Sequence, residues 1–385
     1  MFNHESLTKK QADARRLKDS KDMFRGCLLG GAVADAKGYD VLEGGKTLIS
    51  DNTQMAAFTS DGLIWADQRA KRKGVYAYIP CLFYSYQKWY YTQTGNLADK
   101  NYDFILTGEI LEYDELFARR GKGVTSLNAL GESIQNKYGS LTNRINNSKG
   151  CGCVMRVAPI GLYFTSKPEM AYKIGCESAA LTHGHSDAII SAGYLAHVIA
   201  LLAGGYSLDD SILLSLSKVR EDELESPDCI ELIAKAIKLS KDTKTASREA
   251  IESLGEGYIA PEAIAIATYI SLKYREDFKG AVQAAVDFNG NNDSIAPIVG
   301  NIIGTMIGSL EVPAKWILEL ELADLVIHGS DLLVYKVVEY GLDCRATLAK
   351  TIAYCHRERS ERERSVAIHS KSNRRKQCRI MTSKI

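Results

Sequence analysis

The sequence lacks any strong excess of charge and any long apolar run. Its 385 residues carry 48 Lys and Arg against 47 Asp and Glu, for a formal net charge of +1. Such a balance gives no general attraction to nucleic acid or to anionic membranes. No run of 18 apolar residues could span a bilayer, and residues 1–22 are charged where a signal peptide would be apolar. We therefore expect neither a nucleic-acid partner nor a membrane partner.

Regular cysteine pairing is also missing. The nine cysteines are odd in number and scattered along the chain, which is typical of reduced intracellular thiols and not of a disulfide framework. Cys151 and Cys153 form a Cys-x-Cys pair, but no second pair stands at the spacing of a zinc site. We expect a cytoplasmic protein without structural zinc.

Proline is scarce, with 7 residues, and no segment shows the sustained apolar/polar alternation typical of β-strands. Apolar residues at helical spacing recur through most of the chain, which predicts a single all-α domain over residues 23–343. Residues 1–22 form a charged N-terminal extension, either a solvated arm or an arm that docks on a partner. Residues 344–385 form a basic tail of low complexity that we expect to be disordered.

Small residues mark two of the expected helices. Gly26, Gly30 and Gly31 lie in the first, and Gly300 and Gly304 recur four residues apart in a late one. Each glycine inside a helix costs about 1 kcal/mol, so such repeats predict close packing of helix backbones.

An aromatic segment over residues 75–91 carries tyrosines, a phenylalanine and a tryptophan at close spacing. Helix packing explains these rings better than a platform for base stacking, because no basic cluster interleaves with them.

Two clusters of oxygen-bearing side chains stand before apolar helical segments. The first is Ser50-Asp51-Asn52-Thr53, and the second contains Asn291, Asp293 and Ser294. Hydroxyl, carboxylate and amide oxygens at this density suit a hard cation. A single cluster of this kind is more often only a helix N-cap, whereas two such helix starts could face each other across one site.

Three glycine-bearing segments are candidates for ligand contact. Residues 119–126 form a basic glycine loop before a helix, where backbone N–H groups could hold phosphate. Residues 148–159 form a second loop whose glycines would let a ligand approach the backbone. The turn around His183 and His185 opens a long apolar helix, and one or both histidines could touch a ligand.

Taken in order, these motifs resemble the ADP-ribosylglycohydrolase family, which includes the glycohydrolase that reactivates dinitrogenase reductase and the ADP-ribosyl-arginine hydrolases. The resemblance rests on the glycine-rich helix with Asp35 and on residues 50–55, 150–161, 182–185 and 290–294. It covers about residues 23–340. It implies an orthogonal multi-helix bundle with two metal ions, Mg²⁺ or Mn²⁺, and a hydrolase that removes ADP-ribose from protein side chains, arginine in particular.

The resemblance also implies roles for individual residues. Metal ligands are implied at Ser50, Asp51, Asn52, Asn291, Asp293 and Ser294, with Thr53 completing the first motif. Catalytic roles are implied for Asp51, Asp293 and Glu43, although Glu43 is shifted by one position from the acidic residue of the family pattern. Contacts to ADP-ribose are implied at Gly121, Gly123, Val124, Gly150, Cys151, Gly152, Met155, His183, Gly184 and His185.

The chain departs from the family pattern where Asn52 and Asn291 replace aspartates. Two divalent cations about 4 Å apart repel by on the order of 17 kcal/mol at an effective dielectric of 20, and carboxylates offset this repulsion. An amide brings no charge, so retention of a single ion is the alternative to two.

Two functional classes follow from this departure. The first is a metal-dependent hydrolase of ADP-ribosylated protein, with neutralisation of an ADP-ribosyltransferase toxin, as by an immunity protein, as one role. The second is a catalytically weak relative that binds ADP-ribosylated targets or blocks a toxin through its N-terminal extension.

Overall fold

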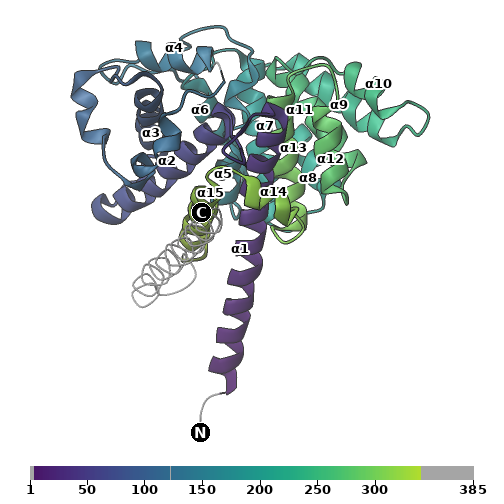
Figure 1. The fold of residues 1–385 in the computed structure, drawn as a ribbon, viewed down its shortest axis with the longest axis horizontal. Coiled ribbons are helices and arrows are strands. Elements are labelled where there is room, and N and C mark those ends of the chain that lie inside the picture. Colours follow the sequence, from purple (N-terminus) through teal and green to yellow (C-terminus); the bar gives the residue numbers. More distant parts are fainter. Residues whose placement is uncertain (1–3, 122, 340–385) are drawn as a thin grey trace, which may run out of the picture. The chain divides into compact units, whose positions relative to one another are not determined.

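A computed structural model of the chain describes residues 4–121 and 123–339. The regular secondary structure of these residues is almost entirely helical (Figure 1). The α-helices are α1 (His4–Tyr39), α2 (Asp51–Lys73), α3 (Tyr78–Thr94), α4 (Val124–Glu132), α5 (Ala158–Tyr163), α6 (Pro168–Ala180), α7 (Ser186–Ala203), α8 (Leu208–Arg220), α9 (Pro227–Lys241), α10 (Ser247–Glu252), α11 (Ala260–Lys273), α12 (Phe278–Val286), α13 (Asn292–Ile307), α14 (Ala314–Glu319) and α15 (Ala323–Glu339). Short 3₁₀ helices are η1 (Lys100–Ile105), η2 (Glu109–Glu112), η3 (Asp114–Phe117) and η4 (Cys151–Cys153).

Strands are nearly absent from the described residues. β1 (Leu42–Glu43) and β2 (Lys46–Thr47) form one antiparallel hairpin, in which Leu42 pairs with Thr47 and Glu43 with Lys46. The prediction of an all-α fold is therefore confirmed.

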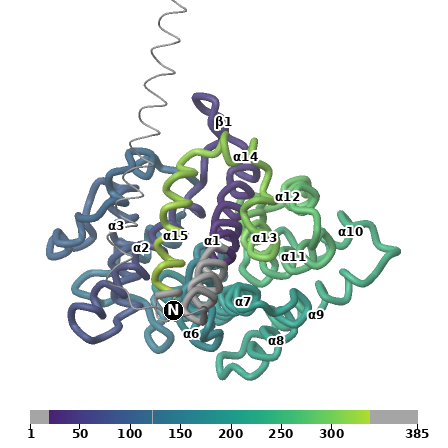
Figure 2. Tube along the Cα trace, turned by 90° about the horizontal axis from the view of Figure 1, so that it is seen from below, coloured from purple at the N-terminus to yellow at the C-terminus, as the bar shows by residue number. Residues whose placement is uncertain are grey.

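The two glycine-bearing helices, α1 and α13, pack along each other (Figure 2). A Cβ atom on Gly30 would lie 2.5 Å from the carbonyl oxygen of Gly300, which is closer than real Cβ atoms come. A Cβ on Gly300 would in turn clash with the carbonyl of Gly30. The close packing of helix backbones expected from the sequence is present, and it aligns the end of α1 with the start of α13.

The core centres on α7, which packs against α5, α6, α8, α11 and α13. Almost every side chain of α7 is buried. Among the described residues, α7 is the one helix whose length and hydropathy would allow it to cross a membrane, and 89% of it is buried inside the fold. Its apolar character is that of a core helix.

The N-terminal extension is continuous with the first core helix. A single helix, α1, includes residues on both sides of position 23. Contact with the fold begins before residue 23, because Lys21 lies 3.5 Å from the Asp331 carboxylate and Asp22 Oδ1 accepts a 2.7 Å hydrogen bond from Ser309 Oγ. The tail expected to be disordered, residues 344–385, lies outside the described residues.

Candidate active site

The first turn of α2 is held by a carboxylate from α1. Ser50 caps α2, and its backbone N–H and hydroxyl both donate to Asp35, at 2.9 and 2.5 Å. The hydroxyl of Thr53 donates to Oδ2 of the same carboxylate at 2.5 Å. Asp35 is fully buried. It therefore fixes the positions of the hydroxyl groups that begin α2.

The second oxygen-rich cluster meets the first. Asn52 Nδ2 donates to the backbone carbonyl of Asp293 at 2.8 Å and to Asp35 Oδ1 at 3.4 Å. Gly38 permits this approach, since a Cβ there would lie 2.8 Å from the Cα of Asp293. The first turns of α2 and α13, more than two hundred residues apart in sequence, thus form one polar site.

Three carboxylates, those of Asp35, Asp51 and Asp293, repel one another in this site. Burial, followed by the charges of Asp35 and Asp293, raises the pKa of Asp51 to about 7. Burial also raises the pKa of Asp35 to about 6, against the lowering effect of the hydrogen bonds it accepts. The pKa of Asp293 is raised by burial as well. No ion pair neutralises Asp51 or Asp293 among the described residues, so the site concentrates unpaired negative charge.

This charge fits a cation, although the donor set is small. No group of three or more His, Cys, Asp and Glu side chains forms a metal-binding cluster in the part of the chain that the structure describes. What the site offers is two half-buried carboxylates, Asp51 and Asp293, beside hydroxyl and amide oxygens. Oxygen donors of this kind suit Mg²⁺ or Mn²⁺.

Both asparagines of the two clusters use their amide nitrogens inside the protein. Asn52 Nδ2 binds the Asp293 carbonyl, whereas Asn291 Nδ2 lies 3.1 Å from Cys151 Sγ and 3.2 Å from the carbonyl oxygen of Gly257. Each amide replaces a charge with a hydrogen-bond donor.

The glycine loop before α4 closes over Asp51. Gly121 has φ +64°, and a Cβ there would clash with Oδ1 of Asp51. Gly123 has φ +45°, and its Cβ would lie 2.9 Å from the other carboxylate oxygen. Only glycine suits a left-handed backbone that passes this close to a side chain. Val124 follows with its side chain 53% exposed.

Arg120 ties this loop to the base of the site. Its guanidinium forms an ion pair of 2.7 Å with Glu321, whose other carboxylate oxygen accepts from the backbone N–H of Ile49 at 3.2 Å. The pair is largely buried. The Arg120 cation is therefore engaged inside the protein.

The second glycine loop and the histidine turn meet at His183. A Cβ on Gly150 or Gly152 would lie 3.5 or 3.6 Å from His183 Nε2. His183 is buried, and its Nδ1 lies 2.8 Å from Thr182 Oγ1. Burial and the Arg156 guanidinium lower the pKa of His183 to about 3. This histidine is neutral at physiological pH and can contribute hydrogen bonds but no charge.

The neighbours of His183 in the turn have structural partners. His185 caps α7, because its Nδ1 accepts from the backbone N–H of Asp187 at 3.1 Å. Gly184 donates its N–H to Asn146 Oδ1 at 2.9 Å, and any side chain there would clash with the Asn146 backbone. Thr125 Oγ1, at the start of α4, lies 3.4 Å from Ser148 Oγ and so links the first loop to the second.

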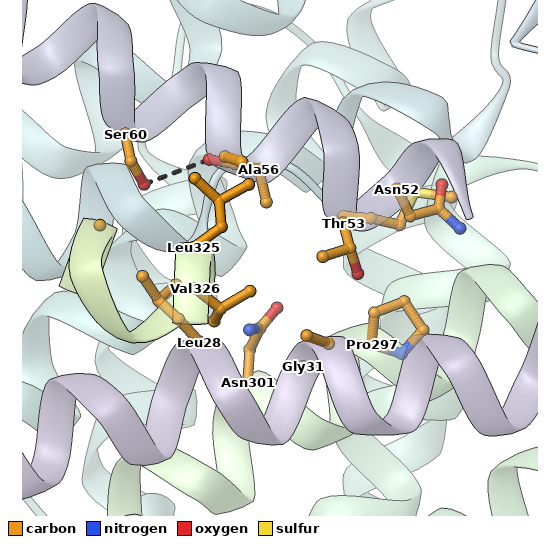
Figure 3. A pocket seen from close by; sticks show the side chains of 14 residues that line it. Leu28, Gly31, Asn52, Thr53, Ala56, Ser60, Pro297, Asn301, Leu325 and Val326 are labelled. Atoms are coloured by element: carbon orange, nitrogen blue, oxygen red, sulfur yellow. Dashed lines mark hydrogen bonds between the residues drawn. The ribbon is translucent and has the colours of Figure 1, made fainter. Parts of the chain in front are cut away.

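Two further predicted site residues differ in burial, Glu43 being exposed and Met155 buried. Glu43 is exposed on β1, and its side chain has no hydrogen bond or ion pair with the described residues. Met155 lines a small cavity behind the first cluster, which Figure 3 shows between Asn52 and Thr53 at one end and Leu325 and Val326 at the other. The cavity measures about 50 Å³, enough for a few water molecules but not for a nucleotide.

Asp35 was underrated by sequence reasoning, which saw only a lone carboxyl group in a glycine-rich helix. Its signal was that one acidic residue stands among small and apolar neighbours. Arg156 was missed as well. It is fully buried, donates to Thr182 Oγ1 at 2.8 Å and lies over the ring of Tyr86 at 4.3 Å, with no carboxylate partner among the described residues.

Comparisons with known proteins agree with this architecture. Residues 16–343 match the family described as ADP-ribosylglycohydrolase. The ADP-ribosylarginine hydrolase Tri1 of Serratia proteamaculans is 21% identical over 324 residues, which are 83% of this chain and 81% of that protein. The ADP-ribosylhydrolase ARH3 of Bos taurus is 28% identical over 193 residues, 44% of this chain and 53% of ARH3, so this match spans about half of that relative.

A solved structure titled "ADP-ribosylglycohydrolase-related protein complex" has the same fold. Its TM-score is 0.58 at 19% identity, over 83% of this chain and 99% of that one. The family match spans the helices that build both oxygen-rich clusters and all three loops around them. This chain belongs to the ADP-ribosylglycohydrolase family.

Proposed function

We propose that the chain hydrolyses the glycosidic bond between ADP-ribose and a protein side chain, at the site where α2 and α13 begin. One observation supports the proposal above the others. Asp51 and Asp293 are held half-buried without an ion-pair partner among the described residues, and the glycine loop of Gly121 and Gly123 passes close to Asp51. Unpaired like charges are unfavourable for folding alone, and such clusters are typical of functional sites.

A divalent cation, Mg²⁺ or Mn²⁺, would be held by Asp51 and Asp293. When bound, it supplies a Lewis acid that lowers the pKa of water and binds hydroxyl groups of the substrate. The two asparagine amides favour retention of a single ion over a pair.

The side chains themselves support glycosidic cleavage. Positive charge develops on the ribose ring as the bond breaks, and the Asp51 and Asp293 carboxylates stabilise charge of that sign. Either carboxylate can orient and accept a proton from a water molecule. The backbone at Gly121 passes close to Asp51, and the loop of Gly150 lies beside His183, which is neutral and serves as a further hydrogen-bonding group.

Arginine is the side chain we propose as the carrier of ADP-ribose. The proposal rests on the family resemblance and on the likeness to Tri1, whose name specifies ADP-ribosylarginine. Neutralisation of an ADP-ribosylating toxin is a further proposal that rests on the resemblance alone. A cytoplasmic location is proposed because the six cysteines within the described residues are all free thiols, as in reducing compartments.

A second candidate function is binding without efficient turnover. It is favoured by the engagement of Asn52 and Asn291 as hydrogen-bond donors at positions that would otherwise supply charge to a metal site. A protein of this kind would recognise ADP-ribosylated targets and leave them intact.

Release of free ADP-ribose from an ADP-ribosyl-arginine protein, with Mg²⁺ or with EDTA, separates these functions. The hydrolase predicts Mg²⁺-dependent release that Asp293→Asn reduces by more than about tenfold. Asp287→Asn is the matched control, because Asp287 is exposed on the neighbouring helix end and its partner is Gln283. Binding of ADP-ribose in calorimetry without any release would favour the second function, and absence of both would exclude the two together.

A further inference from the structure

A second cleft lies on the other half of α2, away from the active site. It has a volume of about 610 Å³, within the range of ligand-binding pockets. Its walls come from the last turns of α2, the start of α3 and the segments that follow α3. The lining residues are Trp65, Arg69, Arg72, Lys73, Ala77, Pro80, Cys81, Tyr84, Phe104, Asn136 and Tyr138.

Three cations edge this cleft. Arg69, Arg72 and Lys73 are exposed and form no ion pair with any residue that the structure describes. They lie three and four positions apart on α2, so they share one face of the helix. The cleft therefore carries a positive charge that no carboxylate of the described chain neutralises.

Two carboxylates of α2 are already engaged. Asp61 pairs with Lys88 at 3.0 Å, whereas Asp67 lies 3.4 Å from Lys71 and 3.2 Å from Lys336. These acidic groups hold other lysines and do not offset the three cations of the cleft.

Aromatic rings also line the cleft. Phe104 is 50% exposed, and its ring lies edge-on to Tyr84 at 5.1 Å between centroids. Tyr84 also lies 6.0 Å from Trp65, and its hydroxyl donates to Asn136 Oδ1 at 2.6 Å. These contacts hold the rings in place, while the exposed part of Phe104 faces no other ring among the described residues beyond Tyr84.

The combination was not visible in the sequence. The aromatic segment over residues 75–91 has no basic cluster interleaved with its rings, which favoured packing over base stacking. The fold places the basic end of α2 beside rings from α3 and η1, since α2 and α3 pack together (Figure 1). Cations and exposed rings in one cleft are the features by which proteins bind nucleotides.

We propose that this cleft binds a nucleotide, with the base against Phe104 and the phosphates against Arg72 and Lys73. The site is separate from the active site. Lys73 stands 22 residues after Asp51 on α2, a distance of ~33 Å along the helix, so no mononucleotide can reach both. The proposal does not depend on the hydrolase activity.

A simpler explanation for the cations is that they stabilise the C-terminal end of the α2 dipole. α9 provides the comparison, because it carries Lys238 and Lys241 in its last turn, and neither lysine lines this cleft. If the dipole is the whole explanation, removing the cations from either helix end should change the affinity for nucleotides by the same factor.

The experiment uses the full chain in EDTA, so that no divalent cation supports binding at the active site. UTP, uridine and inorganic triphosphate are titrated while tryptophan fluorescence is recorded, since Trp65 lines the cleft. We expect UTP to quench the emission with a Kd in the micromolar range. Uridine and triphosphate should each bind at least about tenfold more weakly. Uridine lacks the phosphates that contact the cations, and triphosphate lacks the base that contacts the ring. Trp65→Phe should abolish the UTP-dependent quench.

Matched variants test the geometry. Arg72→Ala with Lys73→Ala should raise the Kd for UTP about tenfold, whereas Lys238→Ala with Lys241→Ala should leave it within twofold. Phe104→Ala should raise the UTP Kd about fivefold and leave that for triphosphate unchanged, with Tyr206→Ala, an equally exposed ring elsewhere, as its control. Melting temperatures establish that every variant is folded.

Several results would overturn the proposal. Equal affinity for UTP and triphosphate would show simple anion attraction, and an equal loss in the α9 variant would show general electrostatics. A full quench in Trp65→Phe would place the nucleotide elsewhere. Stronger binding of an acidic phosphopeptide than of UTP would identify a protein partner in place of a nucleotide.

Discussion

The side-chain amide nitrogen of Asn52 donates a 2.8 Å hydrogen bond to the backbone carbonyl oxygen of Asp293, which joins the first turn of α2 to the first turn of α13. A carboxylate in place of this amide would set a negative oxygen against a carbonyl oxygen and against Asp35. The asparagine thus allows the two helix starts to meet without a cation between them. An aspartate would make their meeting depend on one.

The first prediction restores both carboxylates through Asn52→Asp with Asn291→Asp. In EDTA the variant should lose about 1–3 kcal/mol of stability, because buried acceptors lose their donors. In Mg²⁺ it should regain that loss, bind the ion more tightly and hydrolyse faster. Asn301→Asp is the control, since Asn301 is also buried and donates to a backbone carbonyl, that of Cys27 at 2.8 Å. Equal rescue of the control by Mg²⁺ would contradict the assignment, as would a natural chain that already holds two ions tightly.

The second prediction concerns the loop over Asp51. Gly121→Ala should lower hydrolysis by more than about tenfold, because the new methyl group displaces the Asp51 carboxylate or the loop. Gly74→Ala imposes a similar backbone strain, at φ +73° against +64°, but its Cβ meets nothing within 4 Å. Initial rates and melting temperatures of both variants separate strain from contact. The same loss of rate in Gly74→Ala would mean that strain alone is responsible.

The third prediction is a pH dependence of the cation-free protein. A carboxyl group whose pKa rises on folding binds more protons in the folded state, so its contribution to stability falls as pH rises. For Asp51 the window runs from its unfolded pKa of about 4 to the folded value of about 7.

Asp51→Asn isolates this effect from other titrating groups. In EDTA, the melting temperature of the variant relative to the natural chain should increase between pH 5 and pH 8. Only the natural chain has a carboxyl group at position 51 that ionises in this range. Mg²⁺ should diminish the difference by stabilising the carboxylate. A difference that stays constant with pH would show that Asp51 is not buried against like charge.

The fourth prediction tests Glu43, which the family resemblance implies as an acidic residue near the scissile bond. Glu43 is exposed on β1, and its side chain has no hydrogen bond or ion pair with the described residues. We therefore expect that Glu43→Gln changes kcat by less than about threefold. A loss of kcat above a hundredfold with little change in KM would instead place Glu43 at the reacting bond.

The fifth prediction concerns the packing of α1 on α13. Gly300→Ala should destabilise the fold by about 1–3 kcal/mol, because the methyl group clashes with the Gly30 carbonyl. Gly329→Ala, within α15, has its nearest contact at 3.9 Å and should be neutral or stabilising by up to about 1 kcal/mol. Urea unfolding of the two variants measures the difference, and similar stabilities would exclude close packing as the role of Gly300.

Much of the fold could be predicted because its signals are local. Each helix could be recognised within a short segment, from the spacing of its apolar residues, the scarcity of proline and, in α1 and α13, the glycine repeats. The two oxygen-rich clusters were also visible, since each lies within one short segment. What joins them was not visible, because the contact of Asn52 with Asp293 depends on how distant helices cross.

The role of Asp35 illustrates the same limit. A lone carboxyl group in a helix has several equivalent interpretations until its partners, Ser50 and Thr53, are placed beside it. The cleft on α2 was hidden for the same reason, because Arg72 and Phe104 lie in separate segments of the sequence. The exposure of Glu43 was hidden as well, since nothing in the sequence shows that the hairpin carries this side chain outward.

The glycine contact between α1 and α13 also bears on the order in which the protein folds. Half of the site is synthesised within the first 53 residues, whereas Asp293 follows some 240 residues later. Contacts between such distant segments form late, after the loops between them have closed. During synthesis, Asp35 and Asp51 therefore remain without their partner until α13 has emerged and docked. A chain interrupted before α13 would retain many helices but no assembled site.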